Sequence, residues 1–253
     1  MSPRLTLLLC AICVVAISIA PPASAEVYEL RTYITHEDKL DDLNTRFRDH
    51  TVALFKKHGM ESVGYWVPTD EQASKNTLIY VLRHKSRDAA KASWKAFLDD
   101  PDWQKAFKES RTDGPLLAKP PESTFMELVD YTPEYNPEGA EGDAVFELRI
   151  YRCNEGKLTN LDARFRDHTI GLFDKHGIQS VAYWHPSDAP DSEDTLIYIV
   201  RHKNREAAAA SWKAFASDDA WKKVAKESQK DGKFLRERPE STYMQATDYS
   251  AIK

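Results

Sequence analysis

Some segments of this chain have the apolar and polar pattern of β-strands, and others have apolar residues at helical spacing. The order of these segments predicts the strands and helices of one compact unit. Four segments rich in β-branched and aromatic residues predict strands: residues 27–34, 61–67, 77–84 and 124–131. Between the first two, apolar residues at helical spacing predict a long amphipathic helix over residues 38–58, which Gly59 ends. A second helix begins at Ser86 and restarts at Pro101.

The same pattern occurs twice in the chain. Residues 46–51 (Arg-Phe-Arg-Asp-His-Thr) recur as residues 164–169, and the shared offset is 118 positions (164 − 46 = 118). We therefore predict two domains, residues 26–131 and 144–250. Residues 132–143 contain prolines, glycines and acidic residues, which are typical of a linker.

The order β-α-β-β-α-β predicts an α+β fold of the ferredoxin-like type, with both helices on one face of a four-stranded antiparallel sheet. The other face of each sheet would be bare, and a second copy is the simplest cover for it. We therefore expect the two tandem domains to pack sheet to sheet as a pseudo-dimeric α/β barrel. The alternative is that each copy pairs with a copy from another chain, so a monomeric pseudo-dimer and a homo-oligomer both stay open.

The first 25 residues have the pattern of a signal peptide. Arg4 precedes an apolar run that reaches Ala20, and residues 23–25 (Ala-Ser-Ala) match a signal-peptidase site. We expect cleavage after Ala25, a secreted or periplasmic protein, and no membrane span afterwards. The alternative is a membrane anchor, but the apolar run is short for a bilayer.

Composition restricts the partners. The formal net charge is −5, and acidic and basic residues are interspersed without a basic block, which argues against nucleic acid as a partner. Apolar residues make up 42% of the chain, enough for two ordinary cores. The expected partner is a small molecule or another protein.

The first strand of each copy has one face that is identical in both. Its candidate ligand-binding residues are Glu29, Arg31 and Tyr33, with Glu147, Arg149 and Tyr151 in the second copy. We expect this face to point into the barrel, and the apolar face that contains Leu30 to point toward the helices. The arginines could hold an anionic or carbonyl group in a pocket. Alternatively, Glu of one copy pairs with Arg of the other and fixes the register of the two halves.

His50 and His168 are the candidate catalytic residues, placed by helical spacing on or beside the apolar side of the first helix of each copy. Either could act as a general base or as an axial ligand to haem, or could be a core-edge histidine with a structural role. Arg46 and Arg48, with Arg164 and Arg166 in the second copy, suggest a solvated helix face or the rim of a cleft. No cluster with metal-ligand spacing occurs, so we expect no metal and no bound cofactor, with haem as the exception to test.

Several of these segments together resemble the NIPSNAP domain. They are the first strand (residues 27–33), the helix end at residues 54–59, Tyr65-Trp66, and the helical Trp94-x-x-Phe97 followed by residues 100–103. The resemblance covers nearly all of the chain after residue 26, twice. It implies the dimeric α/β-barrel superfamily, which includes cofactor-independent monooxygenases, haem-handling proteins and many members without an assigned activity. It implies no agreed catalytic residues.

The leading hypothesis is an exported tandem NIPSNAP-like protein that binds a small molecule or a protein partner without catalysis. The alternative is an enzyme of the monooxygenase or isomerase type, with His50 or His168 as base and an arginine as oxyanion partner, or a haem-binding protein. A third hypothesis is an interaction module that uses its outer helices.

Overall fold

The computed structural model describes residues 25–135 and 144–253. The first repeat contains β1 (Val27–Ile34), α1 (Leu40–Arg46), η1 (Phe47–Thr51), α2 (Val52–Lys57), β2 (Glu61–Pro68), η2 (Ala73–Lys75), β3 (Thr77–His84), α3 (Arg87–Asp99), α4 (Pro101–Glu109) and β4 (Glu122–Leu128). The second contains β5 (Val145–Arg152), α5 (Leu158–Arg164), η3 (Phe165–Thr169), α6 (Ile170–Lys175), β6 (Gln179–Pro186), η4 (Asp191–Glu193), β7 (Thr195–His202), α7 (Arg205–Ser217), α8 (Asp219–Ser228) and β8 (Glu240–Ala246). The expected signal peptide, apart from Ala25, and most of the expected linker lie outside the described residues.

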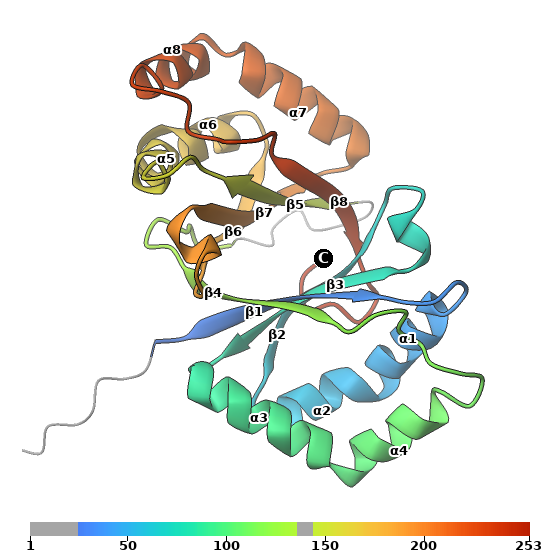
Figure 1. Cartoon of the computed structure of the whole chain (residues 1–253). Helices are drawn as coiled ribbons and strands as arrows, with labels where there is room; N and C mark the ends of the chain where they lie inside the picture. Colours follow the sequence, from blue (N-terminus) through green and yellow to red (C-terminus); the bar gives the residue numbers. More distant parts are fainter. Residues whose placement is uncertain (1–24, 136–143) are drawn as a thin grey trace, which may run out of the picture.

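The strands form one closed antiparallel barrel in the order β1-β3-β2-β8-β5-β7-β6-β4. Each repeat contributes four neighbouring strands, and the repeats join where β2 pairs with β8 and where β4 pairs with β6. In Figure 1 the helices α1–α4 lie on one side of the barrel and α5–α8 on the other. The predicted fold of two ferredoxin-like repeats is therefore confirmed, and the pairing occurs within one chain. Closure leaves neither sheet with an unpaired edge strand.

The interior of the barrel is a packed apolar core to which both repeats contribute. The ring centroids of Trp66 and Phe146 lie 5.6 Å apart, and those of Tyr28 and Trp184 lie 5.7 Å apart. Leu30 of β1 belongs to this same buried cluster. The rings from opposite repeats fill the space between the two sheets.

The expected orientation of the first strand is wrong. Leu30 points into the barrel, whereas Tyr33 packs with Phe47 and other residues of the helix-covered core. Glu29 also points toward the helices, because its carboxylate accepts a hydrogen bond from the indole of Trp94 in α3. The alternation of side chains along β1 identifies its two faces. Both faces are buried in this fold, so the polarity of the side chains does not show which face lies against the helices.

The predicted helix over residues 38–58 is interrupted by a π-helical turn. The turn η1 separates α1 from α2, and η3 occupies the same place in the second repeat. The hydroxyl of Thr51 donates to the carbonyl of Arg46, and Thr169 donates to Arg164, both at 3.1 Å. These hydroxyls provide donors beside a turn whose widened hydrogen-bonding pattern differs from that of the flanking helix.

Within the described ranges, no helix is both long and apolar enough to cross a membrane.

The two repeats differ at a tightly packed position in β2. An added Cβ at Gly64 would lie 2.4 Å from Cζ2 of Trp66, which is fully buried. The counterpart position in β6 holds Ala182 (182 − 64 = 118). We predict that Gly64→Ala lowers the free energy of unfolding by about 1–3 kcal/mol, because the indole must shift inside a filled core.

Ala182→Gly is the matched control, and it should cost about 1 kcal/mol or less through backbone entropy. Urea unfolding of both variants measures the difference. Equal losses for the two variants would contradict the packing argument.

Candidate functional site

A buried carboxylate organises the helix-facing side of each sheet. Glu29 is 1% exposed and lies between β1, β3, β4 and α3. Its oxygens accept hydrogen bonds from Arg31, from Trp94 Nε1 at 2.7 Å and from Ser123 Oγ at 2.7 Å, and they lie 3.0 Å from His84 Nε2. The carboxylate is thereby surrounded by four partners.

The second repeat contains the same arrangement around Glu147. Its partners are Arg149 Nη1 at 2.5 Å, Ser241 Oγ at 2.5 Å, Trp212 Nε1 at 2.7 Å and His202 Nε2 at 3.1 Å. Each Glu–Arg pair lies within one strand, so the alternative prediction of a salt bridge between the two copies is wrong. The binding role predicted for Glu29, Arg31, Tyr33 and their counterparts stays a prediction, now located between sheet and helices.

The environment of each glutamate favours the ionised form. Burial raises the pKa of Glu29, but the hydrogen bond with His84, the charge of Arg31 and the bonds from Ser123 and Trp94 outweigh it. The resulting pKa is about 2. Glu147 has a pKa of about 2 for the corresponding reasons. A carboxylate that holds four partners and stays ionised is suited to fixing structure rather than to accepting protons.

A second arginine in each repeat has a different environment. Arg46 and Arg164 end α1 and α5, immediately before the π-helical turns, and they are 4% and 7% exposed. The expectation of a solvated helix face is therefore wrong for both. Arg46 lies three positions after the buried Leu43, on the apolar side of the helix, so its spacing in the sequence predicts burial.

Neither of these arginines forms an ion pair with a carboxylate among the described residues. Arg46 Nη1 donates to Ser110 Oγ at 3.2 Å. The guanidinium of Arg164 has no hydrogen-bond partner within residues 25–135 and 144–253, and it lies over the rings of Trp221 and Phe234 at 5.2 and 4.8 Å. Burial lowers the pKa of Arg46 to about 10, and burial also lowers the pKa of Arg164.

A cavity of about 280 Å³ lies beside Arg164, between the sheet and the helices of the second repeat. Its apolar walls are aromatic: Phe165, Phe173, Phe215 and Trp221. Its polar groups come from Tyr151, Arg164, Thr169, Gln229 and Lys233. No aspartate or glutamate lines the cavity. The predicted residue Tyr151 therefore lies in a cationic and aromatic pocket.

The candidate histidines lie on the outer side of the same arginines. His168 and Arg164 line a groove of about 530 Å³ between α5 and α8, and His50 and Arg46 line one of about 230 Å³ in the first repeat. Both histidines are exposed, so of the predicted place on or beside the apolar side of the helix, only a place beside it is compatible with the structure. The structure nevertheless places each histidine in a groove with a buried arginine. Their catalytic role stays a prediction.

In the described part of the chain, no three histidine, cysteine, aspartate or glutamate side chains gather in a way that could hold a metal ion.

The sequence matches one family model, NIPSNAP, at residues 28–133 and again at residues 146–251. No curated protein matches it. A candidate monooxygenase of Fusobacterium nucleatum is similar in structure, with 11% identity and a TM-score of 0.57 over 91% of this chain and 95% of that one. An anthrone oxidase-like protein has 13% identity and a TM-score of 0.55 over 90% and 94% of the two chains. A NIPSNAP family protein of Agrobacterium tumefaciens has 22% identity and a TM-score of 0.37, with 43% of this chain and 93% of that one covered.

The low pKa of the buried glutamates predicts a specific dependence of stability on pH. Because the folded-state pKa of Glu29 is about 2, against 4.5 for the free group, its contribution is complete above pH 4.5 and is lost as the pH falls through 2. At pH 7 the shift corresponds to about 3 kcal/mol of unfolding free energy. Glu29→Gln should therefore be much less stable than the parent protein at pH 7.

Urea unfolding between pH 2 and pH 7 measures this difference, which should shrink as the pH is lowered from 4.5 toward 2. A difference that stays constant over this range would show that ionisation of Glu29 does not stabilise the fold.

Proposed function

The chain belongs to the NIPSNAP family as a tandem pair of its domains, and we propose that the second domain binds a small organic anion in the cavity beside Arg164. The observation that carries this proposal is Arg164, which is 7% exposed, has no carboxylate partner among the described residues and has a buried Nε without a hydrogen-bond partner there. Tyr151 and Lys233 line the same cavity, so a bound anion would meet two cationic side chains and a phenol.

A buried charge without a partner is energetically costly. Removal of a charged group from water has a penalty of several kcal/mol, which a partner of opposite charge normally offsets. Arg31, which also lies between a sheet and its helices, has such a partner in Glu29. Arg164 has none among the described residues, and a ligand carboxylate or phenolate could accept its parallel N–H groups in the bidentate geometry that suits a guanidinium.

The walls of the cavity indicate the rest of the ligand. Phe165, Phe173, Phe215 and Trp221 present aromatic surface, which favours a flat ring. A volume of about 280 Å³ is at the lower end of the range for small-molecule sites. The proposed ligand is therefore a one-ring aromatic carboxylate or phenolate.

A second candidate function is an enzyme that removes a proton from a phenolic molecule bound in the neighbouring groove, on the outer side of Arg164. The observation that favours it is the shared groove of His168 and Arg164, which provides a base and a cation that could stabilise an oxyanion. The structures named for a monooxygenase and an anthrone oxidase share the fold at 11% and 13% identity. In this alternative, His168→Ala would lower turnover of a phenolic substrate and leave its affinity unchanged.

The proposed site predicts opposite effects of one substitution on binding and on stability. Arg164→Met should weaken binding of 4-hydroxybenzoate at least tenfold, because a charge-assisted hydrogen bond contributes about 1.5–3 kcal/mol. The same variant should unfold at an equal or higher temperature, since an apolar side chain replaces an unpaired buried charge. Isothermal titration calorimetry and thermal unfolding measure the two effects.

Arg46→Met is the matched control in the first repeat, and it should leave the affinity for 4-hydroxybenzoate unchanged. Undiminished binding by Arg164→Met would exclude Arg164 as the anion site.

A further inference from the structure

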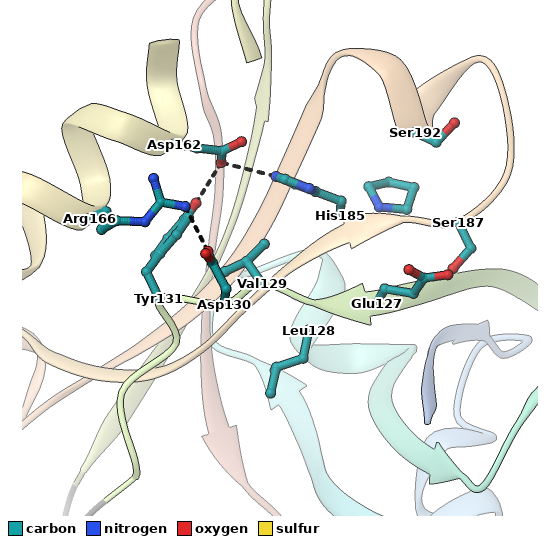
Figure 2. Close-up of a pocket in the computed structure, with 11 residues that line it drawn as sticks. Glu127, Leu128, Val129, Asp130, Tyr131, Asp162, Arg166, His185, Ser187 and Ser192 are labelled. Atoms are coloured by element: carbon teal, nitrogen blue, oxygen red, sulfur yellow. Dashed lines mark hydrogen bonds and ion pairs between the residues drawn. The ribbon is translucent and has the colours of Figure 1, made fainter. Parts of the chain in front are cut away.

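A second cleft lies where the two repeats meet. The segment that follows β4 of the first repeat crosses α5 and β6 of the second repeat and encloses a cleft of about 420 Å³. Figure 2 shows Asp162 pointing from α5 toward both His185 on β6 and Tyr131 of the crossing segment. The cleft is therefore built from both repeats and is separate from the cavity beside Arg164.

Two side chains in this junction cleft converge on one carboxylate oxygen, Oδ1 of Asp162. The hydroxyl of Tyr131 donates to Asp162 Oδ1 at 2.7 Å, and His185 Nε2 lies 3.0 Å from the same oxygen. A neighbouring ion pair joins Arg166 Nη2 to Asp130 Oδ1 at 2.7 Å. Burial and the bond to Asp162 raise the pKa of Tyr131 far above its ordinary value, so the phenol keeps its proton and stays the donor.

The corresponding contacts join the first helix of the first repeat to the segment that follows β8, and they lack counterparts of His185 and Asp162. The hydroxyl of Tyr249 donates to Asn44 Oδ1 at 2.7 Å, and Arg48 pairs with Asp248 at 2.6 Å. Val67 occupies the position of His185 (185 − 67 = 118). The tyrosine and the arginine–aspartate pair therefore suffice to fasten the repeats together, and the His185–Asp162 pair is an addition in one cleft.

We propose that the junction cleft is an active site in which His185 acts as a general base and Asp162 is its positioning residue. A carboxylate that accepts from Nε2–H leaves Nδ1 as the unprotonated nitrogen of the neutral imidazole. Among the described residues, Nδ1 of His185 has no hydrogen-bond partner. The proton of a bound molecule moves to Nδ1, Asp162 stabilises the imidazolium that forms, and the proton later returns from Nδ1 to the same molecule.

The charges of the cleft indicate the class of substrate. The charge of Arg166 is offset by Asp130, while Glu127 and Asp162 add negative charge at the lining. An anion would be repelled, which is the opposite of the cavity beside Arg164. The substrate class that we infer is a small uncharged carbonyl compound, because a general base can remove a proton next to a carbonyl group.

The experiment uses the full chain and dihydroxyacetone, an uncharged hydroxy ketone, in D₂O. Proton NMR follows the replacement of its methylene protons by deuterium. The parent protein should exchange them faster than buffer, His185→Val should return the rate to that of buffer, and Asp162→Asn should slow it at least tenfold. Both substitutions introduce the residue of the first repeat, and Asn44 shows that an asparagine still accepts from the tyrosine.

Two further variants distinguish a catalytic role of the histidine–aspartate pair from a role in joining the two repeats. Asp248→Asn removes the ion pair of the first-repeat counterpart and should leave the exchange rate unchanged. The double variant Asn44→Asp with Val67→His recreates the histidine–aspartate pair in the first repeat and should raise the rate above that of the parent protein.

The tautomer of His185 distinguishes a positioning role of Asp162 from a purely structural one, because a purely structural role does not require a particular tautomer. Long-range proton–nitrogen NMR spectra should show Nε2 protonated in the neutral imidazole and Nδ1 bare, and Asp162→Asn should change this tautomer ratio. An Nδ1-protonated imidazole in the parent protein would overturn the proposal. Exchange at the same rate in the parent protein and in His185→Val would also overturn it. Neither outcome bears on the anion site beside Arg164.

Discussion

Each four-stranded sheet of this protein has two faces and two edges to cover, and the barrel covers one face and both edges at once. The apolar face of one repeat packs on that of the other, with Trp66 against Phe146 and Tyr28 against Trp184. Pairing of β2 with β8 and of β4 with β6 satisfies the backbone groups at the edges. The outer face of each sheet is then covered by helices. The polar side chains of the strands must lie on that outer face, between the sheet and the helices.

The placement of polar groups follows from this closure. The barrel interior is apolar, and the charged residues of the first strand lie under the helices, where indole, hydroxyl and imidazole groups can reach them. Glu29 and Arg31 form an ion pair there, which offsets the cost of burying both charges. Arg46 and Arg164 lie in the same layer without a carboxylate partner among the described residues, and our proposal for a bound anion rests on Arg164 together with the cavity beside it.

Comparison of the two repeats separates the contacts that hold the barrel together from the residues that occur in one repeat alone. Contacts present in both repeats, such as the glutamate networks and the tyrosines that join the repeats, are explained by the need to hold the same barrel together twice. Differences between the copies need another explanation. His185 replaces the apolar Val67, and Lys233 stands where the first repeat has Pro115 (233 − 115 = 118). Both substitutions add a polar group to a cleft or cavity of the second repeat.

The sequence by itself determined the repeat, the order of the elements and the need for a second sheet, since periodicity and an internal copy are local properties of the chain. It also identified Glu29 and His50 as residues of interest. Only the tertiary structure decided that Glu29 faces the helices, because both faces of its strand are buried and the pattern of each is compatible with either side. It also decided that His50, in the π-helical turn η1, is exposed. The meeting of Tyr131 with Asp162 joins distant residues across two repeats, and no spacing along the chain encodes it.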